Sequence, residues 1–124
     1  MKRTKKHTNI FNLPYEYMEF CIVRIGKHIL RSKRKYEEIY AIPRGGLILG
    51  VYLSHYLNIP MVTNVKGPNT LIVDDICDTG KTLQKYKQDK VVLIGKPKGI
   101  KKVKKIFTAY MVLDDTWVVF PWEA

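Results

Sequence analysis

Cysteine is scarce in this chain: its 124 residues contain two, Cys21 and Cys77. This pair has neither the spacing of metal ligands nor the density of a disulfide-rich secreted domain. We therefore expect both to be reduced thiols that pack in the interior of a cytoplasmic protein. The basic N-terminus, Met1 to Lys6, agrees with this location because no apolar segment of a secretion signal follows it.

Long apolar runs are also missing. No stretch approaches the roughly 18 consecutive apolar residues that a membrane helix needs, so we expect no membrane partner. There is no internal repeat and no low-complexity linker, and 124 residues is the length of one domain. The sequence predicts a single domain over residues 1–124, in which residues 1–12 form a basic, loose arm.

Acidic residues are outnumbered two to one, by 22 Lys and Arg to 11 Asp and Glu, which gives a net charge of +11. The basic residues cluster near the N-terminus, at 31–35 and at 96–105. Such a charge attracts nucleic acid or small phosphorylated molecules, and a solvated lysine-rich surface explains it equally well. Aromatic residues are not regularly interleaved with these lysines, so nucleic acid stays an open but not favoured partner.

Helical spacing and short apolar runs alternate along the chain. We expect helices from Pro14 to about 31–35, with Asn12 as a possible cap, and over 47–57 and about 81–88. We expect strands at 39–42, 60–63, 70–73, 91–94 and 105–113. This order predicts an α/β fold with a parallel or mostly parallel sheet flanked by helices.

Two unusual loops follow strands of this predicted sheet, at 43–46 and 74–80. Ligands of parallel sheets bind at the carboxyl ends of the strands, where both loops would lie. The sequence therefore predicts that the two loops meet in one site.

The chemistry of the second loop is specific. The segment from Leu71 to Thr82 reads Leu-Ile-Val-Asp-Asp-Ile-Cys-Asp-Thr-Gly-Lys-Thr. Backbone N–H groups at a helix start, a glycine and two threonine hydroxyls suit a phosphate group. The three carboxylates have the wrong sign for phosphate, but they suit ribose hydroxyls or Mg2+. The segment thus indicates a sugar phosphate bound with a metal ion.

Two common nucleotide motifs are excluded. A nucleoside-triphosphate P-loop needs glycine five positions before Gly80, where Asp75 stands. The chain also has no Gly-x-Gly-x-x-Gly fingerprint of a dinucleotide-binding fold.

These residues resemble a known family. The segment Leu71–Thr82 is similar to the 5-phosphoribosyl-1-pyrophosphate (PRPP) signature of type I phosphoribosyltransferases. The stretch 42–47 resembles their pyrophosphate loop, and 95–97 the segment with a purine-contacting lysine. The stretch 115–123 resembles the C-terminal end of the xanthine/guanine and archaeal hypoxanthine branch. The resemblance spans about residues 15 to 124 and implies a small C-terminal hood over the sheet.

The resemblance implies a role for each matching residue in PRPP binding. Asp74 and Asp75 would contact the ribose hydroxyls, and Asp75 would help to hold Mg2+. Asp78 would also contact PRPP and act as the catalytic acid or base near purine N7, although aspartate equally suits a helix cap. The 5′-phosphate and pyrophosphate would be held by Thr79, Gly80, Lys81, Thr82, Arg44 and Gly45.

A non-proline cis peptide at Pro43–Arg44 is part of the same resemblance. The side chain of Lys81 occupies a variable position and could equally face solvent. Cys77 is not expected to be a nucleophile, because the acids around it oppose thiolate formation.

The purine base would meet three residues of the C-terminal half. Lys96 would donate to the 6-oxo group, Trp117 would stack on the ring, and the Val118 backbone would read the edge. Membership in the lysine-rich surface is the alternative for Lys96. Packing in the core or at an interface is the alternative for Trp117, and it is the favoured interpretation of Trp122.

The implied protein is a Mg2+-dependent purine phosphoribosyltransferase, a homodimer that takes PRPP and guanine, xanthine or hypoxanthine. One feature departs from the family: the flexible loop before the PRPP strand is short, at residues 63–69. A PRPP-binding regulatory or partner-binding module without turnover therefore stays an alternative, and so does a transferase for another base, such as a pyrimidine.

Overall fold

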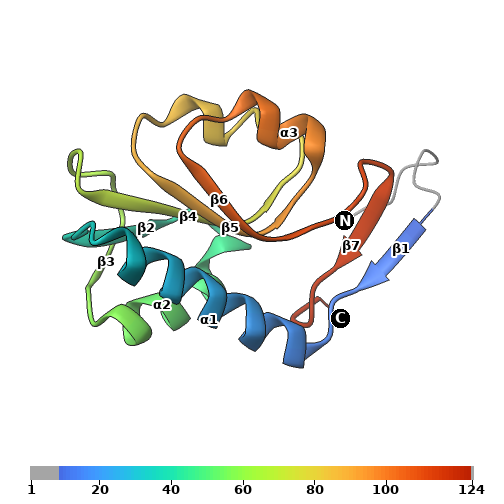
Figure 1. Ribbon diagram of the computed structural model, residues 1–124, viewed down its shortest axis with the longest axis horizontal. Coiled ribbons are helices and arrows are strands. Elements are labelled where there is room, and N and C mark those ends of the chain that lie inside the picture. The colour runs from blue at the N-terminus through green and yellow to red at the C-terminus, as the bar shows by residue number, and fades with distance from the viewer. Residues whose placement is uncertain (1–8, 124) are drawn as a thin grey trace.

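A parallel sheet of five strands forms the centre of the molecule (Figure 1). The computed structural model describes residues 9–123. The strands lie in the order β3-β2-β4-β5-β6, and every neighbouring pair is parallel. Their bounds are Met61–Val62 for β3, Glu38–Ala41 for β2, Thr70–Cys77 for β4, Lys90–Gly95 for β5 and Ile106–Met111 for β6. The predicted α/β fold with a parallel sheet is confirmed.

Helices cover both faces of this sheet (Figure 1). Helix α1 (Tyr15–Ser32) and helix α2 (Gly46–Leu57) lie on one face. Helix α3 (Pro97–Lys102) and the 3-10 turn η1 (Leu83–Lys85) lie on the other. No helix within residues 9–123 combines the length and the apolarity that crossing a membrane requires.

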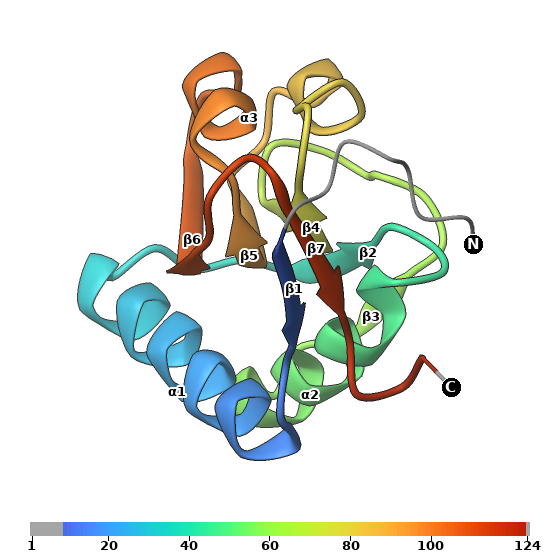
Figure 2. The ribbon, with the colours of Figure 1, turned by 90° about the vertical axis from the view of Figure 1, so that its right-hand side faces the viewer.

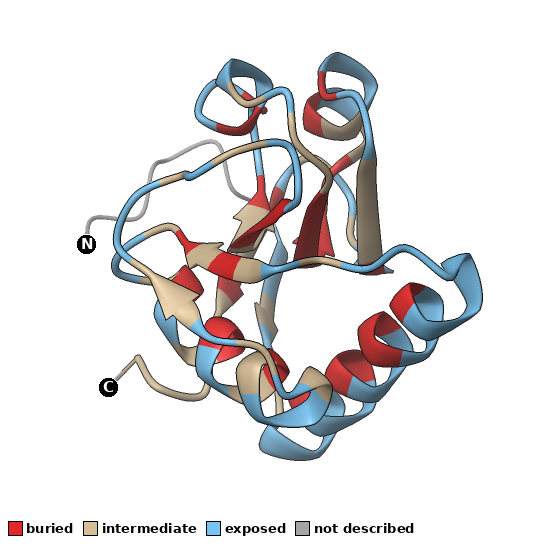
Figure 3. Cartoon of the chain, turned by 90° about the vertical axis from the view of Figure 1, so that its left-hand side faces the viewer, coloured by how far each residue is buried: buried red, intermediate tan, exposed pale blue. Residues whose placement is uncertain are grey.

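The core has two parts, one on each side of the sheet. The larger part lies under α1 and α2, and α1 is buried along the side that faces it (Figure 3). The apolar residues on that side of α1 are Met18, Cys21, Ile22, Ile25 and Ile29. The smaller part lies under α3 and consists of Ile72, Cys77, Leu83, Val92 and Val103. Both cysteines are free and buried, one in each part, so the prediction that they are packing thiols is confirmed.

A second, two-stranded sheet forms the hood. Strand β1 (Asn9–Asn12) pairs in parallel with β7 (Thr116–Val119). Only residues 112–115 separate β7 from the carboxyl end of β6, so the hood stands at that edge of the main sheet, in front of the strand ends in Figure 2. The hood thus borders the edge at which the predicted site lies.

The N-terminal expectations need correction. Residues 9–12 do not belong to a loose arm, because their backbone pairs with β7. Asn12 does not cap α1, because it lies in β1 and the capping position belongs to Pro14, which makes no side-chain cap. The rest of the predicted arm, residues 1–8, lies outside the described residues.

Two boundaries around the PRPP-like segment also differ from the prediction. Strand β4 does not stop before the acids but continues through them to Cys77, because β5 pairs with it as far as Gly95. The helix expected over 81–88 is reduced to η1, and the chain is extended again at Tyr86. Leu83 is the one fully buried apolar side chain of that stretch, which gives a longer helix too little apolar surface to bury.

Candidate functional site

Three backbone hydrogen bonds tie the loops at the carboxyl edge of the sheet into one unit. Ile42 N donates to Val73 O over 2.8 Å, Lys96 N to Cys77 O over 3.0 Å, and Val112 N to Gly95 O over 3.0 Å. The loops after β2, β4, β5 and β6 are therefore held side by side. The two predicted site loops, 43–46 and 74–80, do meet at this edge.

The loop after β4 encloses a small cavity of about 110 Å3. Gly80 has a φ of 81°, a backbone conformation that favours glycine, and its carbonyl accepts a hydrogen bond from Gln84 N at 2.9 Å. Lys81 N donates to Thr79 Oγ1 at 3.3 Å. Complete small-molecule sites measure about 300–1,000 Å3. This cavity therefore suits one phosphate group of a larger ligand, and it is lined by Asp74, Ile76, Cys77, Asp78, Thr79, Gly80, Lys81, Thr82 and Leu83.

Two neighbouring carboxylates stand beside this cavity. Asp75 N donates to Asp74 Oδ1 at 2.8 Å. Burial, and then repulsion from Asp75, raises the pKa of Asp74 to about 8, and burial also raises the pKa of Asp75. A pair of desolvated carboxylates is stabilised by hydroxyl donors or by a cation.

The chemistry of the carboxylate pair suits part of a Mg2+ site. Within residues 9–123, no cluster of three His, Cys, Asp or Glu side chains could cage a metal ion. Mg2+ is typically held by one or two carboxylates together with substrate phosphates and water. Asp74 and Asp75 can supply such carboxylates.

The loop after β2 lies directly against Asp75. The Pro43–Arg44 peptide is cis, as the resemblance implied. A Cβ atom on Gly45 would overlap the Asp75 carboxylate, and one on Gly46 would come within 2.7 Å of Val73 O. The absence of side chains at these two glycines therefore lets the loop approach the acids.

Asp78 and Lys96 form an ion pair across the two neighbouring loops, with 3.3 Å between Lys96 Nζ and Asp78 Oδ1. The Lys96 side chain is 3% exposed, whereas that of Asp78 is 57% exposed. Lys96 therefore does not belong to the solvated lysine surface. Its ammonium group points inward to a carboxylate that solvent and ligands can reach.

Helix α3 supports this pair from behind. A Cβ atom on Gly99 would overlap the backbone carbonyl of Asp78 and come within 3.1 Å of Cys77 Sγ. Burial, then the charges of Asp74 and Asp78, raises the pKa of the Cys77 thiol to about 11, which agrees with a packing role. Nothing in the sequence marked Gly99, because its contact joins two segments that are distant in the chain.

Six of the predicted site residues do not line the small cavity: Arg44, Gly45, Asp75, Lys96, Trp117 and Val118. Arg44 is exposed at the edge of the site, and Trp117 is half-buried on β7, in register with Ile10 of β1. The Val118 side chain belongs to the larger core.

Of two residues near the C-terminus, Trp122 packs against the core and Glu123 acts on Asp75. Trp122 stacks on Phe120 with 4.8 Å between the ring centres and packs, partly buried, against the larger core, which agrees with the predicted packing role. Sequence reasoning missed Glu123. Its carboxylate accepts a hydrogen bond from Phe120 N at 2.9 Å and adds to the rise in the pKa of Asp75 that burial chiefly causes.

Comparison with known proteins places the chain among purine-metabolising relatives. No family model matches the sequence. It is 24% identical over 151 residues to xanthine-guanine phosphoribosyltransferase of Nitratidesulfovibrio vulgaris, covering 100% of this chain and 91% of the relative. It is 30% identical over 119 residues to the protein of that name in Idiomarina loihiensis, covering 72% of each.

Solved structures give the same picture. A purine phosphoribosyltransferase from Pyrococcus horikoshii superposes with a TM-score of 0.74 at 25% identity, covering 94% of this chain and 96% of the other. A Helicobacter pylori xanthine-guanine-hypoxanthine phosphoribosyltransferase shares the fold, with a TM-score of 0.68 at 19% identity and coverage of 94% and 95%.

Proposed function

This chain belongs to the purine branch of the type I phosphoribosyltransferases, and from that premise we propose that it joins a 6-oxopurine to PRPP. The products would be a nucleoside monophosphate and pyrophosphate. The observation that carries the proposal is the meeting of the phosphate-sized cavity, the Asp74–Asp75 pair and the Asp78–Lys96 pair at one edge of the sheet.

PRPP would bind across the loops after β2 and β4. The backbone N–H groups of residues 79–82 would hold the 5′-phosphate in the small cavity. Asp74 and Asp75 would accept hydrogen bonds from the ribose hydroxyls. Arg44 offers a fork of donors for the pyrophosphate oxygens, and Gly45 offers a backbone without a side chain in the way.

Mg2+ would be held by Asp75 together with the phosphates. When bound, it supplies positive charge against the departing pyrophosphate. Arg44, in the loop after β2, would add further positive charge against the same pyrophosphate.

The family relationship further supports a homodimer in the cytoplasm, and light scattering of the purified protein tests the dimer.

The base would lie beside the Asp78–Lys96 pair. Lys96 would donate to the 6-oxo group, Trp117 would stack on the ring, and the Val118 backbone would read the edge of the base. The base would react as its N7–H tautomer, and Asp78 would accept the N7 proton as N9 bonds to ribose C1 and the bond from C1 to pyrophosphate breaks. These residues would position the base for that displacement and stabilise the charge that develops on it.

A panel of bases tests the proposal. The protein is incubated with PRPP, Mg2+ and guanine, xanthine, hypoxanthine, adenine or uracil, and the nucleotides are separated by chromatography. At least one 6-oxopurine should give its nucleoside monophosphate. Product from uracil alone would assign the chain to pyrimidines instead, and no product from any base would contradict turnover.

One observation favours a second function, PRPP binding without turnover. Strand β3 ends at Val62 and β4 begins at Thr70, so residues 63–69 are all that is available to cover the site from this side. A site that stays open to water loses part of the electrostatic advantage of an enclosed one. Calorimetric binding of PRPP together with an inactive base panel would support this second function.

Replacing Lys96 with Met should raise KM for the purine about 10- to 100-fold, because a hydrogen bond to a charged donor is lost. KM for PRPP should change little. The methionine side chain, which is apolar and of similar length, should preserve the packing around buried position 96. The matched control is Lys98→Met, an exposed lysine two positions along the chain. Equal purine KM values for the two variants would contradict the assigned role of Lys96.

A further inference from the structure

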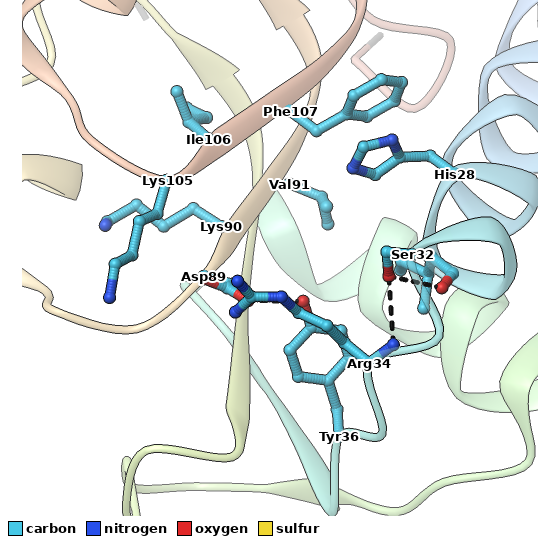
Figure 4. A pocket seen from close by; sticks show the side chains of 11 residues that line it. His28, Ser32, Arg34, Tyr36, Asp89, Lys90, Val91, Lys105, Ile106 and Phe107 are labelled. Atoms are coloured by element: carbon cyan, nitrogen blue, oxygen red, sulfur yellow. Dashed lines mark hydrogen bonds and ion pairs between the residues drawn. The ribbon is translucent and has the colours of Figure 1, made fainter.

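Two larger cavities lie at the amino edge of the sheet, opposite the PRPP site. One measures about 320 Å3 and lies between the end of α1 and the starts of β5 and β6 (Figure 4). The other measures about 550 Å3 and lies between the segment 84–90 and the connection from α3 to β6. Lys90 and Lys105 line both, so the two cavities adjoin at these lysines, and we call the two together the amino-edge surface.

This surface is strongly basic. Lys87, Lys102, Lys104 and Lys105 line the larger cavity, all of them exposed, and none forms an ion pair within the described part of the chain. No acidic residue lines that cavity. Four like charges that converge on a concave surface repel one another, and an anionic ligand would relieve this repulsion.

The remaining charged groups of the surface are already satisfied. Lys90 is buried, and its Nζ donates to Gln88 O at 2.8 Å and to Lys104 O at 2.9 Å, so it forms part of the floor. Asp89, the acid of the smaller cavity, accepts hydrogen bonds from Arg34 Nη1 at 2.6 Å and from the Tyr36 hydroxyl at 2.7 Å. The four lysines of the larger cavity therefore carry the free charge of the surface.

Each cavity also has an aromatic side chain in its wall. Tyr86 lines the larger cavity. In the smaller one, the rings of His28 and Phe107 stack with 3.8 Å between their centres, and Figure 4 shows this pair on the far side of the cavity from the Lys90 and Lys105 side chains. Partial burial lowers the pKa of His28. Lysines and aromatics that are not interleaved in the sequence thus line the same cavities.

We propose that the amino-edge surface binds single-stranded nucleic acid, with phosphates on the four lysines and bases against Tyr86 and the His28–Phe107 stack. A basic groove with aromatic platforms is the general solution for binding single strands. Each cavity has the volume of a small-molecule site, enough for about one nucleotide unit. A duplex, an acidic protein or a simple polyanion would use the lysines but would leave the aromatic faces idle.

Fluorescence anisotropy tests the proposal without any need for turnover. Labelled RNA and DNA single strands of about 15 nucleotides are titrated with the protein over a range of salt concentrations. Four phosphate contacts predict that log K falls with log salt with a slope of about −3. The RNA and DNA arms show which strand is preferred, and binding in either arm supports the proposal.

Charge reversal locates the site. Lys102→Glu combined with Lys105→Glu should weaken binding at least about tenfold and make the salt slope shallower by roughly 1.4, because two contacts are lost. The control, Lys27→Glu with Lys66→Glu, changes net charge equally on exposed lysines that line neither cavity. Circular dichroism verifies that both variants are folded. Equal weakening by the two pairs would overturn the proposal, since net charge alone would then drive binding.

The aromatic contribution is tested separately. His28→Ala removes an exposed ring and should weaken single-strand binding about 5- to 10-fold at unchanged salt slope. Unchanged affinity of this variant for the single strand would overturn the proposal. The proposal would also fail if the parent protein bound inorganic polyphosphate of the same charge as tightly as the single strand, or bound no single strand at low salt.

Discussion

Replacing Asp78 with Asn is expected to lower kcat about 10²- to 10⁴-fold, the usual contribution of a positioned proton donor or acceptor. Asparagine has nearly the same shape but cannot exchange a proton with purine N7. The Asp78 side chain is 57% exposed, so the substitution should leave the fold intact. Initial rates with PRPP and the most active base, together with thermal unfolding, measure both effects.

The ion pair with Lys96 offers a rival explanation for such a loss, and a double-mutant cycle separates the two. If Asp78 merely positions Lys96, then Lys96→Met should lower kcat as much as Asp78→Asn does, and the double variant should lose nothing more. If Asp78 transfers a proton, Lys96→Met should chiefly raise KM for the purine. Glu37→Gln, which changes an exposed acid directly before the amino end of β2, serves as the surface control. A kcat for Asp78→Asn within about twofold of the parent would remove Asp78 from the chemistry.

The elements that could be predicted from the sequence are those with a strong local signal. Helix α1 follows from one apolar stripe, and β4 and β5 follow from runs of buried, mostly branched residues. Strands β1 and β7 have no comparable signal, because each is four residues long and is stabilised by pairing with a partner more than 100 positions away. The extension of β4 through Asp74 and Asp75 likewise depends on pairing with β5, which overrides the low strand preference of aspartate.

The candidate site likewise has features that the sequence predicts and features that it does not. The segment 71–82 is contiguous, so its spacing alone locates the cavity at which Asp74 and residues 78–82 meet. The burial of Lys96 could not be read from the sequence, where it stands at the start of a lysine-rich run. The contact of Gly45 with Asp75 and the approach of Glu123 to Asp75 are long-range packing results with no local pattern.

The contact between Gly45 and Asp75 leads to a second large effect. Gly45→Ala should raise KM for PRPP about 10- to 100-fold, because the new Cβ overlaps the Asp75 carboxylate and forces it to rotate away from the ribose hydroxyls. The backbone itself accepts alanine, since Gly45 has φ −58° and ψ −38°. The overlapped atoms are the end of a side chain, so the loss of stability should be small. Steady-state kinetics and PRPP calorimetry measure the effect.

Two further glycine variants make this prediction specific. Gly67→Ala places its Cβ where no atom lies within 4 Å, so KM for PRPP should stay unchanged and stability should rise slightly, by at most about 1 kcal/mol. Gly46→Ala meets the Val73 backbone at 2.7 Å, which cannot move without disturbing β4, so this variant should lose stability as well as activity. If Gly45→Ala binds PRPP as tightly as Gly67→Ala does, the Asp75 carboxylate does not hold the ribose. The sugar would then have to lie against the cavity of residues 78–82 without help from Asp75.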